Sequence, residues 1–122
     1  MTNDVRQSGQ KETVMTINEY QALALTTANK SLTPVQKLEN GVMGLCGEAG
    51  EVIDIVKKHL FHSHPLDADK LKDELGDVAW YLALTSHALG LTLEEVLEHN
   101  IEKLKKRYPE GFSAEKSLHR AE

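Results

Sequence analysis

The stretch that decides the fold of this chain is GVMGLCGEAGEVIDIVKKHL, residues 41–60. Its second half has the apolar periodicity of an amphipathic helix, whereas its first half repeats glycine at Gly41, Gly44, Gly47 and Gly50. Each glycine inside a helix costs about 1 kcal/mol relative to alanine. A series of four beside two glutamates therefore requires a compensating role.

The helix that contains this stretch is expected to open at Pro34, which suits the first turn of a helix, and to run to about Leu60. The segment HSHPLDAD that follows is typical of a turn. Apolar periodicity then predicts a second long helix from about Ala68 to Leu89, with Gly90 as a natural stop. Two long helices joined by a short turn are expected to form a hairpin.

Two shorter helices flank this hairpin in the sequence. TINEYQALALTTANK, residues 16–30, opens with a Thr16–Glu19 pair that has capping-box spacing. TLEEVLEHNIEKLKKRY opens with a similar pair, Thr92 and Glu95, and ends at Tyr108. No segment has the pattern of a strand, so the sequence predicts an all-α fold, a long-helix bundle of about four helices.

The chain has 122 residues, which is the length of one ordinary domain. We expect a mobile N-terminal tail over residues 1–14, an all-α domain over 15–113 and a C-terminal tail over 114–122. A net charge of −5 gives no basic footprint for nucleic acid, and no apolar run has the length of a membrane span. The lone Cys46, expected to be a buried small residue, suits a reducing compartment, so a cytoplasmic location is expected.

Four acids form two pairs with helical spacing: Glu48 with Glu51, and Glu74 with Asp77. Residues three apart are neighbours on a helix surface, and both pairs extend faces that are otherwise apolar. Clustered carboxylates that point into a bundle need their charge cancelled, and oxygen ligands favour Mg²⁺, with Mn²⁺ as a substitute. The glycines would allow the helices to approach closely and leave room for metals and a ligand. The alternative interpretation is an acidic, solvated helix surface.

These residues resemble a known family, the MazG-like all-α nucleoside triphosphate pyrophosphohydrolases. The resemblance rests on EAGE at 48–51, ELGD at 74–77, the flanking TINEYQ and NIEKLKKRYPEGFS, and covers about residues 16–113. It implies that Glu48, Glu51, Glu74 and Asp77 bind the Mg²⁺ ions that grip a triphosphate. It also implies water attack on the α-phosphorus, which yields a nucleoside monophosphate and pyrophosphate. Glu48 or Glu51 is the candidate catalytic group that orients or deprotonates that water.

The resemblance also implies a nucleotide-binding role for the NxxK segment on the last helix. Asn100, Lys103 and Arg107 share one face of that helix, and Tyr108 follows them. The simpler alternative is that cationic residues here only favour a helix C-terminus. Trp80, next to the second acidic pair, is a candidate for stacking on a base, with core or interface packing as its alternative.

Alternative functions remain open at this point. A phosphoribosyl-ATP pyrophosphohydrolase would bind metal ions in the same way and differ only in its substrate. A non-catalytic helical dimerisation or regulatory module would keep only the fold. A ferritin-like di-iron site needs Glu-x-x-His, which the acidic pairs lack. Because the long helices carry more than one apolar stripe, a homodimer or a dimer-of-dimers tetramer is expected to complete the bundle.

Overall fold

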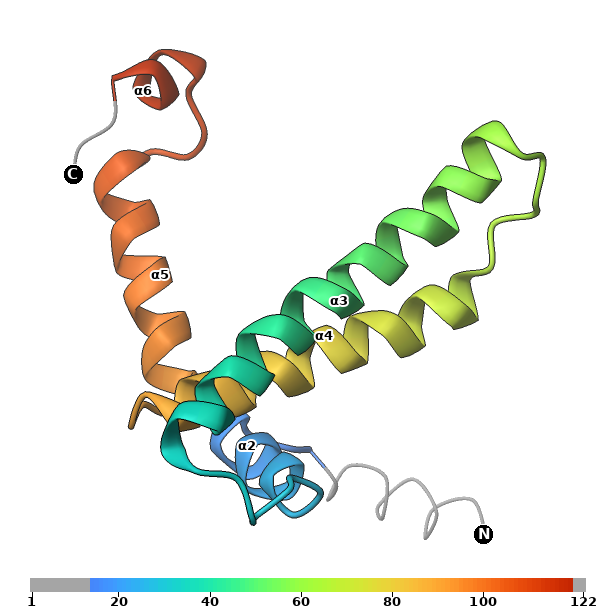
Figure 1. Ribbon diagram of the computed structural model, residues 1–122. Coiled ribbons are helices and arrows are strands. Elements are labelled where there is room, and N and C mark those ends of the chain that lie inside the picture. Colours follow the sequence, from blue (N-terminus) through green and yellow to red (C-terminus); the bar gives the residue numbers. More distant parts are fainter. Residues whose placement is uncertain (1–13, 120–122) are drawn as a thin grey trace, which may run out of the picture.

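In the computed structural model of the chain, residues 14–119 are described, and they form five α-helices without a β-strand. These are α2 (Ile17–Leu25), α3 (Pro34–Phe61), α4 (Ala68–Ala88), α5 (Leu93–Arg107) and α6 (Ala114–Leu118) (Figure 1). The prediction of an all-α fold with four main helices is confirmed.

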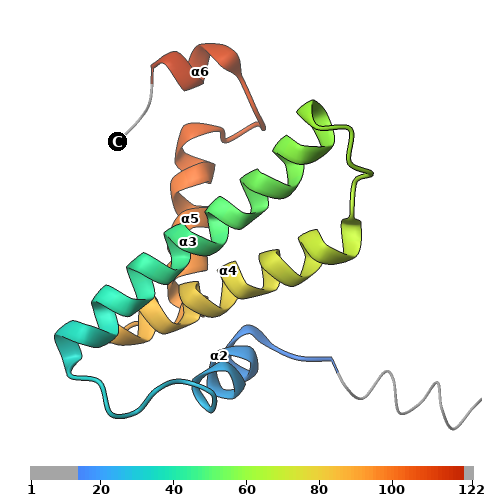
Figure 2. The same ribbon diagram turned by 45° about the vertical axis from the view of Figure 1, so that its right-hand side comes forward.

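The long helices α3 and α4 lie side by side as an antiparallel hairpin, and α2 packs across one side of it near the end of α4 (Figures 1 and 2). The small core lies where α2, α4 and the start of α5 meet. It consists of Ala24, Ala83 and Leu93, with Tyr20 and Trp80 packed against it. From this junction α5 diverges from the hairpin (Figure 1).

The junction is held by side chains from α2 and α4 that satisfy backbone groups of other helices. Gln21 is only 6% exposed; its Nε2 donates to the Ala83 carbonyl at 3.1 Å and its Oε1 accepts from the Leu93 amide at 2.9 Å. The Trp80 indole donates to the Ala24 carbonyl at 3.1 Å. Because buried polar groups are costly when unpaired, these bonds fix how the three helices meet.

The helix starts follow the sequence signals closely. Both expected capping boxes, Thr16 with Glu19 and Thr92 with Glu95, are present with reciprocal hydrogen bonds. A third box, formed by Thr33 and Gln36 on either side of Pro34, was not expected. These caps satisfy amide groups that have no partner inside a helix.

Two segments differ from the expectation. Helix α2 ends at Leu25, whereas helical spacing suggested a helix up to Lys30. The hydroxyl groups of Thr26 and Thr27 donate hydrogen bonds to the carbonyls three residues earlier, where the helix ends. Residues 114–118 form the short, exposed α6 within the segment expected to be a tail. The expected N-terminal tail falls outside the described residues, apart from its last position.

Cys46 is exposed, so the expectation that it is buried is wrong. Each helical residue turns the side chain by about 100°, which places Cys46 about 200° from both Gly44 and Glu48. Those two residues face α4, and the opposite face of α3 is open to solvent.

Apolar stripes on α4 and α5 are not covered by any element within residues 14–119. On α4, Leu75 and Leu89 are each 57% exposed, and Leu82 lies on the same stripe. Helical spacing sets this stripe on a different face of α4 from Trp80 and the core. On α5 the stripe consists of Leu97, Ile101 and Leu104, all exposed. Among the described residues, no helix is long and apolar enough to cross a membrane.

Candidate metal centre

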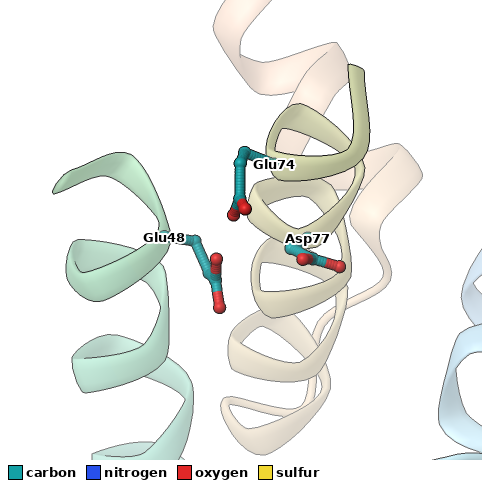
Figure 3. Close-up of side chains that lie close together, drawn as sticks. All are labelled: Glu48, Glu74 and Asp77. Carbon is teal, nitrogen blue, oxygen red and sulfur yellow. The ribbon is translucent and has the colours of Figure 1, made fainter. Parts of the chain in front are cut away.

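Three of the four acids predicted to bind metal lie together across the α3–α4 hairpin. Glu48 from α3 and Glu74 and Asp77 from α4 each offer a carboxylate oxygen within 4.8 Å of the others (Figure 3). Glu48 and Glu74 are partly buried, and Asp77 is exposed. Glu48 and Glu74 thus have the expected inward orientation, whereas Asp77 lies at the solvent-exposed side of the cluster.

Two of the glycines explain how α3 comes so close to α4. A side chain at Gly41 would overlap the Thr85 hydroxyl, and one at Gly44 would overlap the ring of Tyr81. A Cβ at Gly47 or Gly50 would meet no atom within 4 Å. The first pair of glycines therefore permits the close helix contact, whereas Gly47 and Gly50 are exposed and meet no described atom.

The charge of the cluster has a visible effect on its members and on a neighbour from α2. A hydrogen bond with the Glu48 carboxylate, then partial desolvation and the charges of Glu48 and Asp77, raise the pKa of Glu74, against the opposing charge of Lys70. Burial and, next, the negative charge of Asp77 raise the pKa of the Tyr20 hydroxyl. The carboxylates thus carry a shared excess of negative charge that a cation would relieve.

The donor set fits a hard divalent cation. Mg²⁺ binds oxygen at about 2.0–2.1 Å, so oxygens on one ion lie up to about 4.2 Å apart. A separation of at most 4.8 Å among the three carboxylate oxygens needs only small side-chain adjustments to meet this requirement. Neither sulfur nor imidazole takes part, which disfavours zinc as the ion.

Glu51, the fourth predicted ligand, lies outside this group of three. It is exposed, about one turn beyond Glu48, and lines a polar cavity of about 530 Å³ near the hairpin turn. The Asp54–Lys58 ion pair, 2.9 Å between Oδ2 and Nζ, borders the same cavity. Glu51 therefore lies between the cluster and the hairpin turn along α3, where it is exposed to solvent.

The predicted nucleotide-binding residues of α5 do not adjoin the acids within one chain. Asn100 and Lys103 are exposed on a helix that packs against α2 and α4 at its start and then diverges from the hairpin (Figure 1). Arg107 and Tyr108 are partly buried at the end of α5, where the Tyr108 ring lies 5.6 Å from that of Phe112.

Trp80 packs against the small core and donates its indole N–H to Ala24 and, at 3.0 Å, to the Thr27 hydroxyl. Its ring meets that of Tyr81 edge to face, with centroids 4.9 Å apart. Tyr20, by contrast, was not singled out from the sequence as a site residue, although the charge of Asp77 acts on its hydroxyl group. The signal in the sequence that could have identified Tyr20 is its position on the apolar stripe of α2.

One histidine near the hairpin turn is hydrogen-bonded to the backbone. His59 Nδ1 lies 2.9 Å from the His64 carbonyl, in a hydrogen bond that closes the turn after α3. Within residues 14–119 the acidic group of Glu48, Glu74 and Asp77 is the metal-capable cluster that the side chains form.

Comparison with known proteins places this sequence in a family. The sequence profile of a family described as "MazG nucleotide pyrophosphohydrolase domain" matches residues 36–112, which include the whole acidic cluster. A protein of Mycobacterium phage L5 named "Gene 37 protein" is 35% identical over 105 residues, which cover 80% of this chain and 92% of the phage protein. No solved structure matches the chain significantly. The chain therefore belongs to the MazG nucleotide pyrophosphohydrolase domain family.

Proposed function

We propose that the chain is a Mg²⁺-dependent pyrophosphohydrolase that cleaves a nucleoside or deoxynucleoside triphosphate to its monophosphate and pyrophosphate. The carboxylate cluster of Glu48, Glu74 and Asp77 is the observation that carries this proposal. Family membership supports the reaction class. Control of the nucleotide pool, by removal of surplus or aberrant triphosphates, is the physiological role that fits such an activity.

Glu48, Glu74 and Asp77 are the residues that would hold a divalent ion, with Mn²⁺ able to replace Mg²⁺ on the same oxygen donors. Bound there, the ion would neutralise triphosphate charge and polarise the phosphoryl group under attack. The protein's own contribution is to hold the carboxylates before the substrate arrives. This preorganisation comes from the close helix contact at Gly41 and Gly44.

Glu51 is the residue that we assign to the attacking water. It is exposed one turn beyond Glu48 and borders the polar cavity, so its carboxylate can accept a hydrogen bond from a water molecule at the open end of the cluster. A Glu51→Gln variant keeps the size and a hydrogen-bond acceptor but removes the basicity. We expect it to lower the turnover rate more than the affinity for the metal.

We further propose that a second copy of the chain covers the exposed apolar stripes, giving a homodimer or a dimer-of-dimers tetramer. The stripe of Leu75, Leu82 and Leu89 and the stripe of α5 would each lose solvent contact in such an assembly. The same packing would bring Asn100 and Lys103 of one copy to the acids of the other. The basic end of α5, with three cationic residues in its last turn, complements the charge of the acidic cluster.

Pyrophosphate release from a panel of NTPs and dNTPs, with Mg²⁺ and with excess EDTA, tests the function. The expected result is metal-dependent release of equimolar pyrophosphate and monophosphate. Release of inorganic phosphate in its place would contradict the proposed bond cleavage. Inactivity on the whole panel, with activity on phosphoribosyl-ATP, would favour that substrate, and inactivity on both would favour a non-catalytic helical module.

A further inference from the structure

A second cavity, separate from the polar one near the turn, lies at the other end of the hairpin. It has a volume of about 420 Å³ and lies between α2, the segment that leads to α3, and the facing ends of α3 and α4. Its apolar wall includes Ala22 and Leu25 from α2 and Leu84 and Ala88 from α4. This size and character are typical of sites for small organic ligands.

The polar groups at this cavity suit a ligand that combines hydrogen-bonding edges with negative charge. Asn29, Asn40 and His87 line it, together with Lys30 and Lys37, and no carboxylate does. The Asn29 Oδ1 already accepts from the Ser31 amide at 3.0 Å, which leaves the Asn29 NH₂ group as a donor. Amide and imidazole groups can both donate and accept, as the edge of a nucleobase requires.

Helical spacing connects this cavity with the acidic cluster. Leu84 and Ala88 lie 7 and 11 residues after Asp77, and Lys37 lies 11 residues before Glu48. These separations return to the same face of a helix, two to three turns away, or about 10–17 Å along the axis. Helix α2 packs against α4 and contributes Ala22 and Leu25 to the cavity wall. The cluster and the cavity therefore lie along the same face of α4, the helix against which α2 packs.

We propose that this cavity is the nucleoside subsite, which holds the base and sugar of a triphosphate whose phosphates lie at the acidic cluster. The inference rests on the proposed function for its substrate class and goes beyond it in assigning selectivity. Asn40 and His87 read the edge of the base, while Ala22, Leu25 and Leu84 pack against its faces. The two lysines favour an anionic ligand over a cationic one.

The test is direct binding rather than turnover. Non-hydrolysable α,β-methylene analogues of the common NTPs and dNTPs are titrated, with Mg²⁺, into the full chain, and its side-chain resonances are followed by NMR. We expect the His87 ring and Asn40 amide signals to shift with saturation. An Ala22→Phe variant, which fills the cavity from the exposed side of α2, should raise the Kd at least tenfold. The matched control is Leu23→Phe, at an exposed position outside the cavity, with a Kd within twofold of the wild type.

Selectivity gives a second readout that loss of structure would not produce. Asn40→Ala and His87→Ala should change the ranking of the bases while each variant keeps the wild-type circular dichroism spectrum. Analogue binding that leaves the cavity signals unmoved, or an Ala22→Phe variant with unchanged affinity, would overturn the subsite. So would an Ala22→Phe variant that changes only the oligomeric state, because a second copy would then occupy the cavity.

The same experiment separates the two proposals. Analogues that bind in the cavity, with no pyrophosphate released from the matching natural triphosphates, would support the subsite and refute the enzyme. Pyrophosphate release with the cavity signals unmoved would support the enzyme and refute the subsite. If no analogue binds at all, the subsite is refuted.

Discussion

The two halves of the α3–α4 hairpin use the same residue for opposite purposes. In the half near α2, Gly41 and Gly44 let Thr85 and Tyr81 pack directly on the α3 backbone. In the half near the turn, Gly47 and Gly50 are exposed and meet no atom of the described residues, and this half also holds the acidic cluster. A glycine series with even spacing is thus divided between contact and open space. The contacts at Gly41 and Gly44 fix the distance between α3 and α4, and the acids of the other half lie across that distance.

The largest effect is expected from the open half. Asp77→Ala removes a carboxylate from the cluster and should lower Mg²⁺-dependent pyrophosphate release at least about 1,000-fold, because the ion would lose a ligand and its position. The metal-free stability should not fall, since the variant also removes a repelling charge. Asp73→Ala, an exposed acid of α4 outside the cluster, is the control and should retain activity. Full activity of the Asp77 variant would refute the site.

Mixing two inactive variants tests whether a second copy completes the open half. Asp77→Ala lacks the cluster and Lys103→Ala lacks the cationic group of α5, so each variant should be inactive alone. If α5 acts on the other copy, random mixed dimers restore about a quarter of the wild-type sites, since half of the dimers have one intact site of two. Restoration requires exchange of subunits, which a tagged copy can verify. No recovery after verified exchange would place Lys103 outside the neighbouring site.

Alanine substitution of one glycine from each half of the hairpin tests whether the two halves differ in packing. Gly44→Ala should lower the free energy of unfolding by about 1–2 kcal/mol, because overlap with the Tyr81 ring outweighs the gain in helix propensity. Gly47→Ala meets no atom and should be neutral or stabilising by up to about 1 kcal/mol. Urea denaturation of both variants measures the difference. Truncation of Tyr81 in the Gly44→Ala background should recover part of the loss, and equal effects at both glycines would contradict the division.

The smallest effect concerns the ion pair at the open end. The hydrogen bond from Lys58 lowers the pKa of Asp54 from its usual 3.8, so this contribution to stability is present above that pH and is lost as the pH falls through the lowered value. Lys58→Gln removes it. We expect wild type and variant to differ slightly above pH 5 and to converge as acidification protonates Asp54, measured by thermal unfolding. A difference that grows on acidification would contradict this sign.

Much of the fold could be predicted from local signals. The capping boxes at Thr16 and Thr92 and the proline at 34 give helix starts that agree with the structure to within one residue, because a cap acts through neighbours in sequence. The end of α2 at Leu25 could not be predicted in this way. Residues 26–30 have acceptable helix propensity, and the end depends on the threonine hydroxyls and on packing against α4.

The acids of the cluster could be predicted from the sequence, but their arrangement in space could not. Spacing alone paired Glu74 with Asp77 on one face and brought Glu48 to the same hairpin. That Glu51 stays outside the group of three depends on the register between α3 and α4, which pairs Gly44 with Tyr81. Register is a property of two helices together, and helical periodicity within one of them does not contain it. The cavity between α2 and the hairpin escaped prediction for the same reason.

The Gln21 side chain has a consequence for the order of folding. Its hydrogen bonds join residues 62 and 72 positions apart, whereas α3 and α4 are joined by a turn of six residues. Closing a loop about ten times longer costs about 2 kcal/mol more in chain entropy. The hairpin should therefore form early and α2 should dock late. A Gln21→Leu substitution would then accelerate unfolding and leave the folding rate nearly unchanged, because the bond forms after the rate-limiting barrier.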